Sequence, residues 1–111
     1  PTMPDKLILT VAPCIPPYAA SKVPGLDLSP EGIADEVVRA WTPANLAHLH
    51  VWDEQGQPTQ DTAAFEPTLA LIRARCDIII EGSTGGVGAL TPAQRSVSLG
   101  CDIELASLNP G

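Results

Sequence analysis

Apolar residues along the chain gather in four short runs, and longer segments of mixed polarity separate these runs. The runs cover residues 7–12, 46–51, 77–82 and 101–108. The first and third runs are continuous and rich in branched side chains, which is typical of strands buried on both faces of a parallel sheet. We therefore predict four strands, the first of them ended by the prolines that follow it.

The segment between the first two runs predicts a helix that begins after a proline-rich loop. Ser29-Pro30-Glu31 combines a capping hydroxyl, a proline suited to the first helical position and an acidic side chain near the positive end of the helix dipole. Ile33, Val37 and Trp41 recur at helical spacing and predict one buried stripe. Thr42-Pro43 predicts the end of this helix.

Two further helices are expected between the later runs. One covers 62–75 with Phe65, Leu69 and Ile72 on its buried side, although Pro67 forfeits a backbone hydrogen bond there. Thr91-Pro92-Ala93-Gln94 opens the other with a capping-box pattern. Strands that alternate with helices indicate right-handed crossovers and a parallel sheet, so we predict an α/β fold. The length of 111 residues fits a single domain, 1–111.

The second run carries both histidines of the sequence, His48 and His50. Side chains two positions apart in a strand point to the same face, so the two imidazoles are expected to project together. Such a pair can bind one divalent cation, with each nitrogen about 2.0–2.1 Å from the ion. The alternative is a hydrogen-bonded pair with a structural role. Two ligands do not complete a catalytic zinc site, which normally has three from the protein.

Other unusual polar residues also follow the ends of predicted strands. Cys14 follows the first strand, Ser83-Thr84 the third, and Ser107 and Asn109 end the fourth. Parallel α/β sheets bind ligands at the carboxyl ends of their strands, so this clustering favours a functional site. A nucleophilic pair of Cys14 with a histidine is the less favoured interpretation of the same cluster.

The third strand leads into a glycine-rich segment, Ser83-Thr84-Gly85-Gly86-Val87-Gly88. Amides exposed in such a turn can bind a carboxylate or a phosphate, although most glycine turns only reverse the chain. The segment lacks the Lys-Ser/Thr of a P-loop and the full GxGxxG spacing, which disfavours nucleotide binding.

The charge balance narrows the range of partners. Six Lys and Arg against 13 Asp and Glu give a net charge of −7, which disfavours a nucleic-acid surface. No apolar run reaches the roughly 18–20 residues needed to span a bilayer, and no secretory signal is visible. The odd cysteine count without a CxxC pair favours free thiols. We therefore expect a cytoplasmic protein without a membrane or nucleic-acid partner.

Several motifs occur in an order that resembles a known enzyme family. They are the strand 7–12, Ser29-Pro30-Glu31, His48-Leu49-His50-Val51, Gly56-Gln57-Pro58-Thr59-Gln60, Ile78–Ile80, Ser83-Thr84-Gly85-Gly86 and Ala106-Ser107-Leu108-Asn109. Together they resemble the β-keto acid cleavage enzymes, which include the 3-keto-5-aminohexanoate cleavage enzyme. The resemblance covers nearly the whole chain, and HLH followed by GxPTQ and STGG is fairly specific as a set.

The resemblance implies a (β/α)8 barrel, of which this chain would supply roughly the first four βα units. It implies a Zn²⁺-dependent reaction of a β-keto acid with acetyl-CoA, in which a retro-Claisen step releases acetoacetate and a new acyl-CoA. His48 and His50 would be zinc ligands. Ser83 and Gly86 would bind the carboxylate end of the keto acid, and Ser107 would contact the substrate.

The sequence also departs from the family pattern. The family's third zinc ligand, a glutamate, and its base and arginine lie later than residue 111, so no catalytic residue is assigned within this chain. Trp52 stands where many members have arginine. The loop Pro13-Cys14-Ile15-Pro16-Pro17 lacks the acidic residue that aminohexanoate-cleaving members offer to a substrate amine, which disfavours an amino-substituted substrate.

Four strands cannot close an eight-stranded barrel. We therefore expect either a longer natural polypeptide or copies that pair into a homo-oligomer. Two other functions stay open: a different metal-dependent α/β-barrel hydrolase or lyase, and an inactive fragment whose histidines have a structural role.

Overall fold

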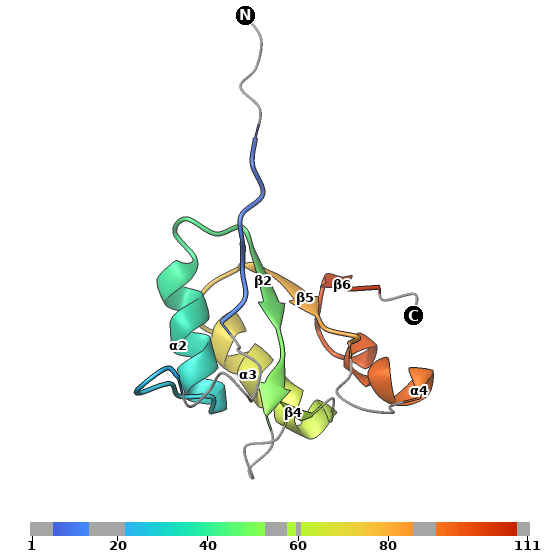
Figure 1. Ribbon diagram of the computed structural model, residues 1–111. Helices are drawn as coiled ribbons and strands as arrows, with labels where there is room; N and C mark the ends of the chain where they lie inside the picture. The colour runs from blue at the N-terminus through green and yellow to red at the C-terminus, as the bar shows by residue number, and fades with distance from the viewer. Residues whose placement is uncertain (1–5, 14–21, 53–57, 60, 86–90, 109–111) are drawn as a thin grey trace, which may run out of the picture.

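A parallel four-stranded sheet forms the centre of the protein. The computed structural model describes residues 6–13, 22–52, 58–59, 61–85 and 91–108 (Figure 1). The strands are β1 (Thr10–Val11), β2 (Leu46–Leu49), β5 (Ile79–Gly82) and β6 (Leu105–Ala106), in the order β1-β2-β5-β6. Every pairing in this sheet is parallel. The predicted α/β alternation and parallel sheet are confirmed, and they fit part of a (β/α)8 barrel.

Two helices cover one face of this sheet. Helix α2 (Pro30–Ala40) and helix α3 (Thr62–Arg73) lie side by side on it (Figure 1). Their apolar side chains pack against alternate residues of β2 and of the β5 segment. The shared core contains Ile33, Ala34, Val37, Phe65, Leu69, Ile72, Ala47, Leu49, Ile78 and Ile80. The opposite face of the sheet therefore receives the intervening residues of both strands.

Helix α2 begins as its sequence predicts. The Ser29 hydroxyl accepts a hydrogen bond from the Gly32 amide at 3.1 Å, and the Asp27 carboxylate accepts one from the Ser29 amide at 2.9 Å. These bonds hold the loop so tightly against the helix that a Cβ at Gly32 would collide with the Asp27 carbonyl oxygen. The helix ends at Ala40, and Trp41 is 41% exposed. The expectation that Trp41 continues the buried stripe is therefore wrong.

Helix α3 buries the side that the sequence predicts, and it continues through its internal proline. The Asp61 carboxylate caps it by accepting a hydrogen bond from the Ala63 amide at 3.0 Å. Pro67 lies inside the helix. The helix ends at Arg73, two residues earlier than predicted, and the Arg73 guanidinium donates to the Ile78 carbonyl at 2.9 Å and to the Asp102 carbonyl at 3.1 Å. This arginine ties the helix to the segments that enter β5 and β6.

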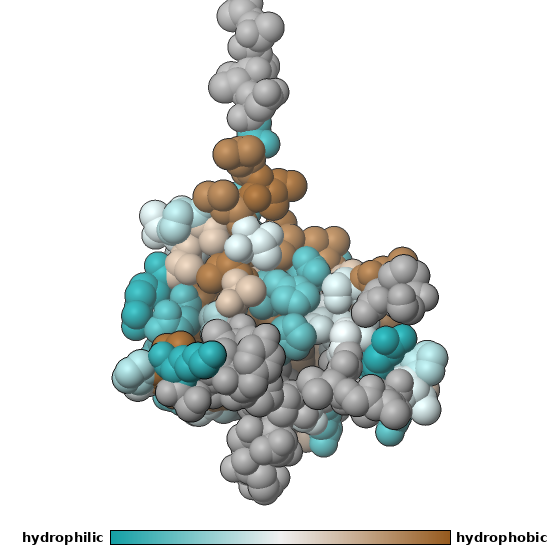
Figure 2. Space-filling model, in the orientation of Figure 1, coloured by the Kyte–Doolittle hydropathy of each residue, from teal (hydrophilic) through white to brown (hydrophobic). Residues whose placement is uncertain are grey.

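The first predicted strand is much shorter than expected. Only Thr10–Val11 pairs with β2, and Leu7 and Ile8 are 81% and 77% exposed. The prediction of a strand buried on both faces is wrong here because β1 is an edge strand, with β2 as its only neighbour among the described strands. Figure 2 shows the resulting apolar surface below the grey N-terminal trace.

The fourth predicted strand is also short. Only Leu105–Ala106 pairs with β5. Glu104 gives the reason: its carboxylate accepts the Ile80 amide at 2.7 Å and the Arg73 guanidinium at 2.6 Å. This side chain takes the Ile80 amide, a backbone donor that a longer strand would use, so 101–103 does not pair with β5. The Glu104 amide still donates to the Ile80 carbonyl at 3.1 Å.

The predicted third helix begins with the expected capping box of Thr91 and Gln94. It is short, with α4 (Pro92–Arg95) followed by a 3-10 turn, η1 (Val97–Gly100). Cys76 is buried, Cys101 is partly buried, and both are free thiols, as predicted. Cys14 lies outside the described residues. Within the described residues, each helix falls short of the length and apolar content that a bilayer-spanning helix requires.

Candidate functional site

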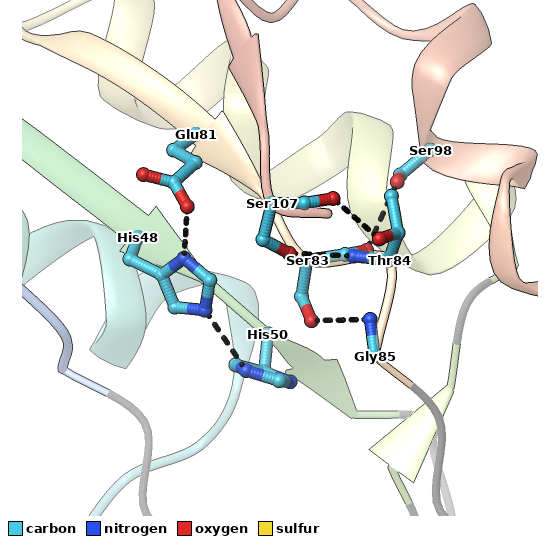
Figure 3. A network of polar contacts seen from close by, with 8 residues as sticks. All are labelled: His48, His50, Glu81, Ser83, Thr84, Gly85, Ser98 and Ser107. Atoms are coloured by element: carbon cyan, nitrogen blue, oxygen red, sulfur yellow. Dashed lines mark hydrogen bonds and ion pairs between the residues drawn. The ribbon is translucent and has the colours of Figure 1, made fainter. Parts of the chain in front are cut away.

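His48 projects from the face of the sheet that the helices leave uncovered. Its neighbours in β2, Ala47 and Leu49, are fully buried in the helix-facing core. His48 is in register with Glu81 of β5. The His48 Nδ1 atom lies 3.0 Å from Glu81 Oε1, and both side chains are 24% exposed. A two-residue side-chain alternation in each strand therefore brings an imidazole and a carboxylate together (Figure 3).

His50 joins this cluster from just beyond the end of β2. The predicted continuous strand 46–51 is divided: β2 ends at Leu49, and β3 (Val51–Trp52) pairs with β4 (Pro58–Thr59) in a separate antiparallel sheet. The two imidazoles still point toward each other, with 3.2 Å between their Nε2 atoms and 5.0 Å between ring centroids. The prediction that both rings share one side is confirmed (Figure 3).

The electrostatic setting favours the neutral form of His50. Burial lowers the pKa of His50, and the neighbouring His48 lowers it further. A neutral imidazole keeps a nitrogen lone pair, which a metal ligand needs. His50 is therefore suited to bind a cation near neutral pH.

The two nitrogens also fit a tetrahedral zinc ion. Nitrogens that bind one such ion at about 2.0–2.1 Å lie roughly 3.3–3.4 Å apart, and the two Nε2 atoms are 3.2 Å apart. A carboxylate only accepts hydrogen bonds, so the Glu81 contact requires the proton of neutral His48 to be on Nδ1. The lone pair of neutral His48 is then on Nε2. Among the described residues no group of three or more His, Cys, Asp or Glu could hold a metal ion.

Hydroxyl groups line the neighbouring loop after β5. The Ser83 hydroxyl accepts a hydrogen bond from the Gly85 amide at 3.1 Å. The Ser83 amide donates to the Leu49 carbonyl at 3.2 Å, and the Ser83 carbonyl accepts from the fully buried Ser98 hydroxyl at 3.2 Å. Ser83 is thus fixed from three directions, and Figure 3 shows it beside the histidine pair.

Ser107 reaches the same loop from the end of β6. Its hydroxyl accepts the Thr84 amide at 3.1 Å, and its own amide donates to the Gly82 carbonyl at 3.1 Å. The structure therefore brings Ser83 and Ser107 together with the histidines at the carboxyl ends of β2, β5 and β6 (Figure 3). Gly86, the remaining predicted substrate contact, lies outside the described residues.

Sequence reasoning missed Glu81 and Ser98. Glu81 had a usable signal, because a carboxylate inside an otherwise apolar strand needs a partner. Its identity as the partner of His48 depends on the register between β2 and β5, which the sequence does not state. Ser98 carries no such signal, since an isolated serine in a short helical turn is ordinary.

A comparison with protein families identifies the chain. The family model of the beta-keto acid cleavage enzymes matches residues 6–111. This chain belongs to the β-keto acid cleavage enzyme family. The predicted resemblance is confirmed, and the match includes both histidines, Ser83 and Ser107.

Curated relatives agree with the family. The chain is 36% identical, over 98% of its length, to the 3-keto-5-aminohexanoate cleavage enzyme of Fusobacterium nucleatum subsp. nucleatum. It is 38% identical, over 96% of its length, to the 3,5-dioxohexanoate:acetyl-CoA acetone transferase of Paraburkholderia graminis. It is 34% identical, over 96% of its length, to the 3-keto-5-aminohexanoate cleavage enzyme of Acetoanaerobium sticklandii.

These relatives are much longer than the chain. It spans 41%, 35% and 40% of their respective lengths. The four-stranded sheet thus corresponds to a minor part of each relative.

Proposed function

We propose that this chain supplies the zinc-binding and keto-acid-binding part of an active site that cleaves a β-keto acid with acetyl-CoA. The products would be acetoacetate and a new acyl-CoA. The observation that carries the proposal is the 3.2 Å separation of the two histidine Nε2 atoms beside the hydroxyls of Ser83 and Ser107. Membership of the family supports the reaction class.

His48 and His50 would hold the zinc ion. When bound, zinc would act as a Lewis acid that polarises the keto group of the substrate. The protein's part is to keep the His50 imidazole neutral and to aim both Nε2 atoms at one point. Burial of His50 and the carboxylate behind His48 serve these two purposes.

Ser83 would bind the carboxylate end of the keto acid, and Ser107 would contact the substrate. Each hydroxyl accepts a backbone amide, from Gly85 and Thr84 respectively, and can still donate its own O–H to an anion. A net charge of −7 gives no general attraction for an anionic substrate, so local donors must provide it. The Gly86 amide is a further proposed donor.

The remaining groups of the site would come from outside the 111 residues. A third zinc ligand, a base and an arginine for coenzyme A chemistry are the groups that the family resemblance implies. Later residues of the same polypeptide or a second chain would supply them. Cytoplasmic location and homo-oligomer formation stay predictions.

The test is acetyl-CoA consumption by the protein that carries this chain, measured against a panel of β-keto acids. The panel includes 3,5-dioxohexanoate and 3-keto-5-aminohexanoate, and we expect the amino-substituted acid to be the poorer substrate. His48→Ala and His50→Ala should each abolish turnover, whereas Glu36→Gln on the exposed side of α2 should not. Metal-dependent hydrolysis without coenzyme A would contradict the proposal and favour a hydrolase.

A further inference from the structure

Glu81 places a carboxylate inside the sheet, in contact with the imidazole of His48. It lies in β5 between Ile80, which is fully buried among the helices, and Gly82. It faces the side of the sheet that carries the histidines, and its register partner in β2 is His48. Arg73 is paired with other groups, since its guanidinium contacts Glu104 and the Asp102 carbonyl.

The contact between Glu81 and His48 involves the nitrogen remote from His50. Glu81 Oε1 lies 3.0 Å from His48 Nδ1, while His48 Nε2 lies 3.2 Å from His50 Nε2. Figure 3 shows the three side chains in a row, with the His48 ring between the carboxylate and the second imidazole. A ring held at Nδ1 cannot turn over without breaking that bond.

We propose that Glu81 is a positioning residue that fixes the ring orientation and the Nδ1–H tautomer of His48. In this role Glu81 leaves the Nε2 lone pair directed at the point that His50 also faces. Carboxylates that accept the second N–H of a metal-bound histidine orient the ring and raise its basicity, and their loss typically weakens metal binding about 10–100-fold. The inference extends the proposed zinc site, on which it rests.

A purely structural ion pair is the competing explanation. Such a pair would stabilise the sheet between β2 and β5 and would leave the tautomer and metal affinity unaffected. Partly exposed pairs of this kind contribute little to stability. The two explanations therefore predict different zinc affinities and different His48 tautomers when Glu81 is replaced.

The experiment compares Glu81→Gln and Glu81→Leu with Glu36→Gln, a matched carboxylate exchange in an exposed ion pair on α2. Zinc affinity is measured on the protein that carries this chain, by competition with a chromogenic chelator at fixed pH. We expect Glu81→Leu to lower it roughly 10–100-fold. Glu81→Gln keeps an acceptor oxygen and should lose less, while Glu36→Gln should match the wild type.

A second readout uses the metal-free protein. Imidazole ¹⁵N chemical shifts should show the Nδ1–H tautomer for His48 in the wild type and a mixture of tautomers in Glu81→Leu. Unchanged zinc affinity or an unchanged tautomer in Glu81→Leu overturns the inference and leaves the proposed function standing. A wild-type protein that carries this chain together with the residues supplying the third ligand, and that binds no zinc, overturns both. Circular dichroism of each variant identifies a loss of fold, and Glu81→Gln, which preserves side-chain size, then decides the result.

Discussion

Thr84 and Ser107 are joined by two hydrogen bonds across the ends of β5 and β6. The Thr84 amide donates to the Ser107 hydroxyl at 3.1 Å, and the Thr84 hydroxyl donates to the Ser107 carbonyl at 2.5 Å. Both residues are partly buried. The pair links two loops that are far apart in the sequence, and it fixes the hydroxyl that we assign to substrate binding.

Replacement of Ser107 by alanine should therefore affect both stability and substrate affinity. Ser107→Ala leaves the Thr84 amide without its acceptor, and we expect a loss of about 1 kcal/mol in the free energy of unfolding. It should also raise KM for the keto acid more than it lowers kcat. Ser107→Thr keeps the hydroxyl and is the control. Urea denaturation and steady-state kinetics measure the two effects, and a Ser107→Ala protein with wild-type KM would contradict the assignment.

Loss of either imidazole should remove metal binding. His48 and His50 contribute one nitrogen each, so His48→Ala or His50→Ala should weaken zinc binding by more than the roughly 10–100-fold that an outer-shell change costs. Zinc stoichiometry after dialysis against a weak chelator provides the measurement. Cys101→Ser controls for adventitious binding by the partly exposed thiol. Retention of zinc by both histidine variants would show that the ion binds elsewhere.

The carboxylate of Glu104 should make stability depend on pH. Burial acts to raise the pKa of Glu104, but hydrogen bonds from Arg73 and the Ile80 amide, with the arginine charge, outweigh it and lower that pKa from 4.5. A carboxyl whose pKa falls on folding stabilises the folded state above its unfolded pKa, and this contribution is lost as pH falls through the folded pKa.

The difference in unfolding free energy between the wild type and Glu104→Gln should accordingly be constant above about pH 5 and shrink below about pH 4.5. Denaturation with urea at a series of pH values measures it. Glu36→Gln serves as the control on α2. A difference that grows on acidification would mean that folding raises the pKa of Glu104 instead of lowering it.

Gly32 provides a case in which two effects oppose each other. Alanine in a helix is favoured over glycine by about 1 kcal/mol, which predicts that Gly32→Ala stabilises α2. The new Cβ would collide with the Asp27 backbone oxygen, and overpacking of this kind costs about 1–3 kcal/mol. We expect net destabilisation.

Gly100→Ala is the matched control for that substitution, because a Cβ there meets nothing within 4 Å. Its free energy of unfolding should stay within about 0.5 kcal/mol of the wild type. Thermal or urea denaturation of both variants gives the comparison, and a stabilised Gly32→Ala protein would show that the Asp27 loop moves aside at little cost.

Local signals in the sequence predicted the helix starts and the histidine pair. Caps such as Ser29 and Thr91 act within three residues of themselves. The spacing of His48 and His50 predicts rings on one side, and the rings share a side although β2 ends at Leu49. Glu81 required knowledge of which residue faces His48 across two strands. That register joins residues 33 positions apart, His48 and Glu81, and no local signal states it.

The predicted limits of the first and fourth strands were wrong, because the length of an edge strand depends on its pairing with the adjacent strand. Leu7 and Ile8 have strand-forming side chains, but a strand exists only where backbone groups find a partner. The register with β2 covers Thr10–Val11, and Leu9 bonds to Asn45 and Leu46 at the entrance to β2. At the other edge, the Glu104 carboxylate bonds to the Ile80 amide and replaces a backbone acceptor. Hydrophobic pattern alone does not distinguish these outcomes.

The exposed leucines beside β1 determine how the isolated chain will behave in solution. Edge backbone groups flanked by apolar side chains are a template for intermolecular strand addition. The mutual repulsion of molecules with a net charge of −7 opposes it. At 1 M salt, screening reduces the range of that repulsion to about 3 Å. Light scattering should therefore rise with ionic strength, so preparation of the chain by itself calls for dilute, low-salt buffers.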